Sequence, residues 1–218
     1  EREINAFIKQ EVIHSREHVS FNKRVADAGY DISLLEQNFL DARKQNKGRS
    51  KFVNLAATMA AEHFTAMIAH ELLSNPKHLA GADAESARLW RWHALEEIEH
   101  KGVAYDTWLH ATRDWSRWKR WKAKSLTMLI VSRRFTKHRA AGILELLRQD
   151  GVTGFKARWG LVRFAFGNPG MVRRCFFAWL AYFMPGFHPW KHDDRELIAL
   201  TESEYLDALL PEARLASA

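Results

Sequence analysis

Two short strings of the sequence place a glutamate and a histidine three residues apart. Glu11 and His14 form the first Glu-x-x-His pair, and Glu97 and His100 form the second. In a helix, this spacing stacks a carboxylate and an imidazole on one face, about one turn apart. Both side chains can then reach one ion, and carboxylate with imidazole suits iron, manganese or zinc. The pairs therefore indicate a metal site.

Further His and Glu residues extend the two pairs in helical phase. His18 lies one turn beyond the first pair, and His93 and Glu96 share an arc of about 100° with the second pair. A third segment adds Glu62, which small residues follow along the same face. His93, His18 and Glu96 are expected to bind the ions or to support the ligands, with His93 the first candidate. We predict that the direct ligands are Glu11, His14, Glu62, Glu97 and His100.

A solvated helix face is the alternative interpretation of these residues. Glu97 and Lys101, four residues apart, also have the spacing of an ordinary surface ion pair. However, Trp92, Leu95 and Val103 surround the second pair with apolar surface. This pattern predicts an inward-facing cluster, where ionisable groups without partners carry a large desolvation cost. We therefore favour a metal site.

The elements that must position these residues are predicted to be helical. Gly and Pro number only 11 and 5 in 218 residues, and long stretches contain neither. A weaker aromatic and basic pattern covers residues 155–183. We divide the chain into a metal-binding helical core, residues 1–111, and a basic, aromatic helical region, residues 112–218, that completes the bundle. Apolar spacing and helix-ending residues predict helices over residues 3–28, 33–46, 51–73, 83–111, 115–149 and 193–209.

Three strings carry most of the candidate ligands: Glu11-x-x-His14-x-x-x-His18, Glu62-His63-Phe64-Thr65-Ala66, and Trp92-His93 followed by Glu96-Glu97 and His100-Lys101. Together they resemble a bacterial family called predicted metal-dependent hydrolases, and they are also similar to the motifs of ferritin-like di-iron proteins. The resemblance implies an all-α, ferritin-like helical bundle with a dinuclear metal site. The two ions would be Fe, with Mn or Zn as alternatives. The sequence departs from the ferritin-like pattern because it has no clear fourth Glu helix, for which Glu36 is the nearest candidate.

Charge is distributed unevenly along the chain. Residues 1–111 carry a net charge of −2, residues 112–174 a net charge of +13, and residues 175–218 a net charge of −4. Within the basic block, three indoles recur every third residue among Lys and Arg: Trp115, Trp118 and Trp121. Interleaved Trp and basic residues are typical of a membrane interface. A core helix with a solvated basic face would give the same pattern.

An uncharged run of thirteen residues, Cys175 to Phe187, repeats the aromatic pattern between flanking basic residues. It is too short to span a bilayer, which takes about 20 residues. We therefore predict that residues 115–134 and 173–191 form one surface that binds an anionic membrane peripherally, at its inner face. One cysteine excludes an internal disulfide, and we expect a cytoplasmic location. The sequence contains no recognised nucleic-acid module, so nucleic-acid binding is not predicted, and no oligomeric state is predicted.

Three functions fit these features. We favour a di-iron oxygenase or oxidase that acts on a small lipophilic substrate at a membrane surface. The alternative is a dinuclear metal-dependent hydrolase of an ester or phosphoester, in which the ions lower the pKa of bound water. The third is a non-enzymatic metal- or membrane-binding protein. An oxygenase would require iron and O₂, a hydrolase would work without O₂, and the third would bind metal without turnover.

Overall fold

A computed structural model describes the backbone of residues 2–216 and the side chains of residues 2–44 and 47–205. The described residues contain nine α-helices, two short 3-10 helices and no strand, which confirms the all-α prediction. In chain order the helices are α1 (Arg2–Asp27), α2 (Ser33–Asn46), α3 (Lys51–Ser74), η1 (Pro76–Leu79), α4 (Ala84–Glu99), α5 (Val103–Ala111), α6 (Arg117–Gln149), α7 (Gly154–Phe166), α8 (Met171–Ala181), η2 (Pro189–Lys191) and α9 (Arg195–Ala216).

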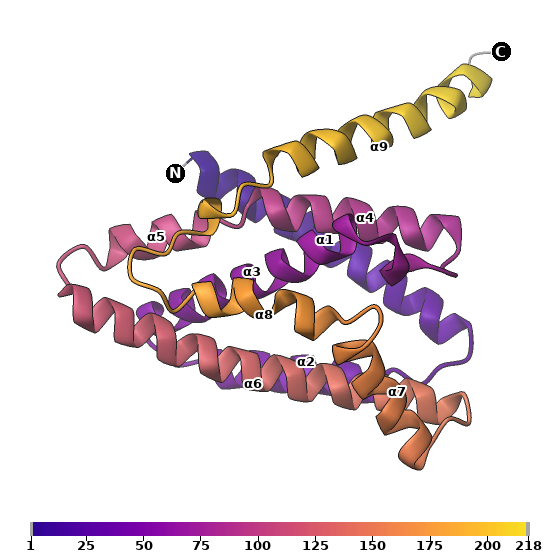
Figure 1. Ribbon diagram of the computed structural model, residues 1–218, viewed down its shortest axis with the longest axis horizontal. Helices are drawn as coiled ribbons and strands as arrows, with labels where there is room; N and C mark the ends of the chain where they lie inside the picture. The colour runs from indigo at the N-terminus through magenta and orange to yellow at the C-terminus, as the bar shows by residue number, and fades with distance from the viewer. Residues whose placement is uncertain (1, 217–218) are drawn as a thin grey trace.

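Helix α3 is the central element of the bundle. It is rich in alanine, and its buried residues spread over more than half of its circumference instead of one narrow stripe. Small side chains let neighbouring helices approach closely, and α3 packs against α4, α5, α6 and α8. Figure 1 shows α3 between α1 and α4 on one side and α6 on the other. This position brings Glu62, near the middle of α3, next to the helices that carry the two Glu-x-x-His pairs.

The apolar core has two parts on either side of α3. The larger part joins α3, α5, α6 and the turn after α8, and its most buried large side chains are Met59, Trp108, Met128 and Tyr182. The smaller part joins α3 and α4 and is covered by the first turns of α9. Its buried members are Ala69, Leu73, Ala94 and Ile98. Together the two parts fix α4 and α5 against α3.

The single helix predicted over residues 83–111 is wrong. Asp83 caps α4 as expected, because its carboxylate accepts from the Ser86 amide at 2.9 Å. However, α4 ends at Glu99, and α5 begins only at Val103. Gly102 lies in the break, where a β-carbon would sit 2.6 Å from Nε1 of Trp190. The break therefore accommodates a side chain from 88 residues further along the chain, which helical spacing cannot predict.

Four of the other helix predictions agree closely with the structure, and the remaining differences lie near residue 168 and at the end of α9. Helices α1, α2, α3 and α6 begin and end within two residues of their predicted bounds. The pattern over residues 155–183 forms two helices, α7 and α8, because Pro169 disfavours helical geometry at the preceding residue. Helix α9 begins at Arg195 and continues beyond the predicted 193–209 segment, and it points away from the bundle (Figure 1).

Residues 182–194, here called the strap, connect α8 to α9 across one end of the bundle. Trp121 and Lys124 of α6 donate to backbone oxygens in the strap, Phe183 at 2.7 Å and Tyr182 at 2.5 Å respectively. At the other end of the strap, Asp194 forms an ion pair with Lys101 in the break between α4 and α5. Both side chains are only 3% exposed, so breaking this pair would cost on the order of 3–5 kcal/mol.

None of the described helices is both long enough and apolar enough to cross a bilayer. The longest, α6, carries much of the basic block, and buries Lys124 on the side that faces the strap. The basic block is therefore not solvated along its whole length.

Candidate metal centre

Three helices bring seven of the eight predicted site residues together. Helix α1 contributes two of them, α3 contributes one, and α4 with its C-terminal cap contributes four. We call this group the Glu/His cluster, and its members are Glu11, His14, Glu62, His93, Glu96, Glu97 and His100. The helical spacing noted in the sequence places each subset on an inward face, and α3 completes the cluster from a third direction.

His14 lies at the centre of the cluster. It is 3% exposed and is the one fully buried side chain of α1. Its Nδ1 lies 3.7 Å from an oxygen of Glu11 and 3.8 Å from an oxygen of Glu97, and its Nε2 lies 2.5 Å from an oxygen of Glu96. Carboxylates thus surround both nitrogens of this imidazole.

Five of the seven members form two overlapping groups of donor atoms, and Glu62 and Glu96 each contact a histidine of these groups. His100 Nδ1 lies 3.3 Å from an oxygen of Glu62, and His93 Nε2 lies 3.4 Å from an oxygen of Glu97. One group combines the first Glu-x-x-His pair with His100, and the other combines His14 with His93 and Glu97. Within each group the donor atoms lie within 4.8 Å of one another. The two groups share His14, so this arrangement could hold one ion or two neighbouring ions.

Three buried donor atoms of the cluster have no hydrogen-bond partner: Nε2 of His14, Oε2 of Glu96 and Nε2 of His100. The short contact between His14 and Glu96 lacks hydrogen-bond geometry. Leaving such groups unpaired in the interior costs about 1–3 kcal/mol each. A divalent cation would satisfy nitrogen and carboxylate lone pairs together. The residues present therefore fit a metal ion.

Burial sets the protonation states in the cluster. Burial and the neighbouring His14 and His18 rings lower the pKa of His93 to about 3, so its imidazole is neutral and able to bind metal. Burial and the nearby Glu62 carboxylate raise the pKa of Glu97. The low-dielectric site thus disfavours a second negative charge unless a cation is present. Both shifts follow from the same inward placement.

Three residues considered from the sequence lie outside the cluster. His18 is exposed, packs edge-on against His93 with ring centroids 4.7 Å apart, and belongs to neither donor group. Glu36 is exposed on α2, which packs against α6, and provides no fourth ligand helix. His63 turns to the other side of α3, where its Nε2 donates to the Ala178 carbonyl at 3.1 Å and its ring stacks on Tyr182.

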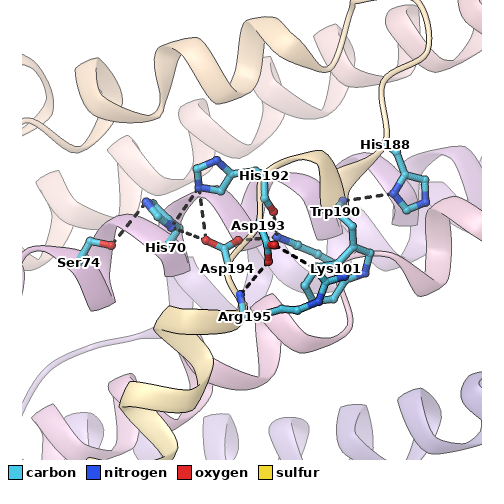
Figure 2. Close-up of polar contacts among 9 residues, drawn as sticks. All are labelled: His70, Ser74, Lys101, His188, Trp190, His192, Asp193, Asp194 and Arg195. Atoms are coloured by element: carbon cyan, nitrogen blue, oxygen red, sulfur yellow. Dashed lines mark hydrogen bonds and ion pairs between the residues drawn. The ribbon is translucent and has the colours of Figure 1, made fainter.

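A second polar cluster was not predicted from the sequence. It joins His70 of α3 to the end of the strap and to Lys101, as Figure 2 shows. We call it the clasp, and its members are His70, Lys101, His192 and Asp194. The available signal was the string His188-Pro-Trp-Lys-His192-Asp-Asp194, which is unusually rich in His and Asp. Sequence spacing alone gave no indication that this string meets α3.

The fold and the Glu/His cluster define an all-helical protein with an interior suited to metal. The chain belongs to the predicted metal-dependent hydrolase family, which matches residues 1–193 and confirms the resemblance. No curated protein and no solved structure matches the chain. Membership of this family supports a metal-dependent enzyme, and it favours the hydrolase alternative over the di-iron oxygenase that we expected.

Proposed function

We propose that this protein hydrolyses an ester or phosphoester bearing an apolar group, with one or two divalent ions held by the Glu/His cluster. The observation that carries the proposal is the pair of overlapping donor groups around buried His14, in each of which the donor atoms lie within 4.8 Å of one another. The family match supports hydrolysis as the reaction class. How many ions bind, and which metal they are, are parts of this proposal.

Five residues would bind the ions directly: Glu11, His14, Glu62, Glu97 and His100. His93 would be a further ligand, because its Nε2 faces the Glu97 carboxylate at 3.4 Å. Glu96 would orient the His14 ring, because metal-bound imidazoles commonly direct their second nitrogen toward a carboxylate. His18 would bound the cluster through its ring contact with His93.

When bound, a divalent ion supplies Lewis acidity and lowers the pKa of water. The protein itself would position the ions, exclude solvent from them and surround them with negative charge. The Phe7 ring lies 5.0 Å from the His100 ring and the Trp92 ring lies 5.4 Å from His14, so aromatic surface excludes solvent from two sides. The carboxylates provide the negative charge that retains cations.

Substrate would approach along α1. The Glu11 side chain is 42% exposed, unlike the rest of the inner cluster. It lies on a shallow, open apolar face of α1 together with Ile8, Val12 and Val19, all of which are exposed. An apolar group could lie along these side chains while the bond to be cleaved reaches the carboxylates. This arrangement supports a substrate with lipophilic character.

The test is hydrolysis under anaerobic conditions by protein loaded with Zn²⁺, Mn²⁺ or Fe²⁺. Substrates would be 4-nitrophenyl esters of increasing acyl length and bis(4-nitrophenyl) phosphate. Glu62→Gln keeps the side-chain volume and removes a carboxylate from the cluster, whereas Glu36→Gln makes the same change on the exposed face of α2. We expect the first variant to lose about 100-fold or more in activity, since even outer-shell changes cost about 10–100-fold, and the second to be unchanged.

Three outcomes would overturn the proposal. Equal activity of Glu62→Gln and Glu36→Gln would show that hydrolysis does not depend on the cluster. Iron-dependent O₂ consumption with a lipophilic substrate, without anaerobic hydrolysis of any ester, would instead restore the oxygenase hypothesis. Metal binding without turnover of either kind would favour the non-enzymatic hypothesis.

A further inference from the structure

Three donor atoms of the clasp converge at one point. His70 Nδ1 lies 2.7 Å from Asp194 Oδ1, and His192 Nε2 lies 3.3 Å from each of these two atoms. Figure 2 shows the two imidazoles and the carboxylate turned toward one another. The three residues come from α3 and from the end of the strap, so the contact is formed by the fold and not by local spacing.

Protons are one way to fill this triangle. A carboxylate oxygen accepts, and each imidazole nitrogen either donates or accepts. If both nitrogens carry protons, both N–H groups donate to the same Asp194 oxygen, at 2.7 Å and 3.3 Å. If only one carries a proton, the other nitrogen directs a lone pair at the Asp194 oxygen. A cation at the centre of the triangle would use all three lone pairs instead.

The three separations are close to those of ligand atoms around a tetrahedral metal ion. Ligand atoms bound about 2.0–2.1 Å from Zn²⁺ in tetrahedral geometry lie about 3.3–3.4 Å from one another. Two of the three separations in the clasp are 3.3 Å. The third, between His70 and Asp194, is the length of a direct hydrogen bond and needs an increase of about 0.6 Å. Rotation of the partly exposed His70 ring can supply it.

The other oxygen of Asp194 is already held in place. It accepts from Lys101 Nζ, and the same ammonium donates to the His192 backbone oxygen at 2.7 Å. A carboxylate ligand supported by a second hydrogen-bonded group is a common feature of metal sites. The Lys101 charge also opposes a cation, so the affinity should be lower than that of a closed structural zinc site.

We propose that His70, His192 and Asp194 form a second, mononuclear site for a transition-metal ion such as Zn²⁺. It is separate from the Glu/His cluster, because His70 and Glu62 are eight residues apart on α3, about 12 Å along its axis. The site fastens the strap to α3. His192 is 60% exposed, so a fourth coordination position opens toward solvent and a water completes it.

Titration of metal-free protein with Co²⁺ tests this site, because tetrahedral Co²⁺ has a strong visible absorption. The variants are His192→Ala, which removes an exposed ligand and should leave the fold intact, and His188→Ala, a matched change in the strap. His188 contacts Asp106 and lies outside the triangle. We expect His192→Ala to bind one Co²⁺ fewer than wild type and to lose the tetrahedral absorption of that ion, and His188→Ala to match wild type.

Stability provides an independent measurement. Zn²⁺ should raise the melting temperature of a Glu62→Gln protein, and His192→Ala in that background should abolish the rise. The result remains interpretable if the Glu/His cluster binds no metal, because the difference between the two variants reports only on the clasp. Equal Co²⁺ stoichiometry and equal Zn²⁺ response with and without His192 would overturn the proposal.

Discussion

In the first half of the chain, buried imidazoles and carboxylates face one another in one cluster, whereas in the second half Lys124, Trp121 and Trp179 each donate to a single oxygen. His14 and His100 end in nitrogens without a hydrogen-bond partner. By contrast, Lys124 donates to a strap carbonyl, Trp121 donates to the next one, and Trp179 donates to Ser132 Oγ at 2.8 Å. The same interior thus contains a cluster of facing ionisable groups in one half and several single donor–acceptor contacts in the other.

Buried polar groups therefore have two different roles in this protein. A buried group with one good partner contributes to the fold and needs nothing further. A group of donors that cannot satisfy one another retains capacity for a ligand from outside the chain. The first half therefore carries the candidate chemistry, and the second half supplies the frame that closes the bundle around it. Each prediction below tests one side of this comparison.

The largest effect is expected from removal of metal and of a cluster carboxylate. Chelation should lower the free energy of unfolding of wild type by about 2.7 kcal/mol if the ion was present at 100 times its Kd. Glu97→Ala should lose on the order of 3–5 kcal/mol, because it removes the carboxylate that faces His93 and one of the carboxylates around buried His14. Denaturant titrations with and without chelator measure both quantities.

Glu36→Ala is the matched control for that experiment, since Glu36 is exposed on α2. It should keep the full response to chelator, whereas Glu97→Ala should keep only the part that the clasp contributes. If wild type unfolds at the same denaturant concentration with and without chelator, the unpaired atoms of the cluster are not metal donors. The difference between the two halves would then say nothing about function.

Lys124 tests the other half through pH. Burial lowers its pKa to about 8, against an ordinary value of about 10.4. Between these values the unfolded chain holds a proton that the folded protein has lost, so the contribution of Lys124 to stability rises with pH. The rise should reach about 3 kcal/mol at most, at 1.36 kcal/mol per unit. Below about pH 8 both states are protonated and the contribution is constant.

Lys124→Met isolates this contribution. Burial raises the pKa of Cys175 to about 12, so the thiol changes stability in the opposite direction over the same range. The useful quantity is therefore the difference in unfolding free energy between wild type and Lys124→Met, measured from pH 7.5 to about 10.5. A difference that stays flat across this range would show that Lys124 is hydrated in the folded protein and that its single contact is not a buried one.

Helix boundaries could be predicted where the signals that set them are local in the sequence, and not where distant residues set them. Helices α1, α3 and α6 were predicted closely because apolar spacing and terminal Gly or Pro residues are local signals. The break after Glu99 was missed because its cause is Trp190, which packs where a β-carbon of residue 102 would lie. Local preference favoured a continuous helix, and a tertiary contact overrode it.

The same rule explains the two polar clusters. The Glu/His cluster could be predicted because each helix presents its residues at helical spacing, so Glu11 with His14 and Glu97 with His100 are visible without a fold. The clasp could not be predicted, because His70 and Asp194 are 124 residues apart and meet only through the strap. The predicted role of Glu36 failed for the related reason that α2 packs against α6, away from the cluster.

Substitution of Trp118 should have the smallest effect on stability. It also tests directly whether the basic half of the chain binds a membrane. The Trp118 side chain is 65% exposed, although its ring stacks on Trp121 with centroids 4.9 Å apart. We propose that Trp118 inserts into an anionic membrane surface while Trp121 anchors the strap. Trp118→Ser should leave the unfolding free energy within about 0.5 kcal/mol of wild type and should weaken sedimentation with anionic vesicles. Trp121→Ser should reduce stability instead, because its indole donates to the Phe183 carbonyl.

Salt and a third variant complete this test. Basic residues near an anionic surface contribute roughly 1 kcal/mol each, and salt screens that part but not the burial of an indole. Vesicle binding should therefore weaken with salt without vanishing. Phe39→Ser removes an exposed aromatic outside the basic block and should bind as wild type does. If wild type does not sediment with anionic vesicles even at low salt, Trp118 and the basic residues of α6 do not form a membrane surface. The proposal of a lipophilic substrate would then be supported only by the apolar face of α1 beside Glu11.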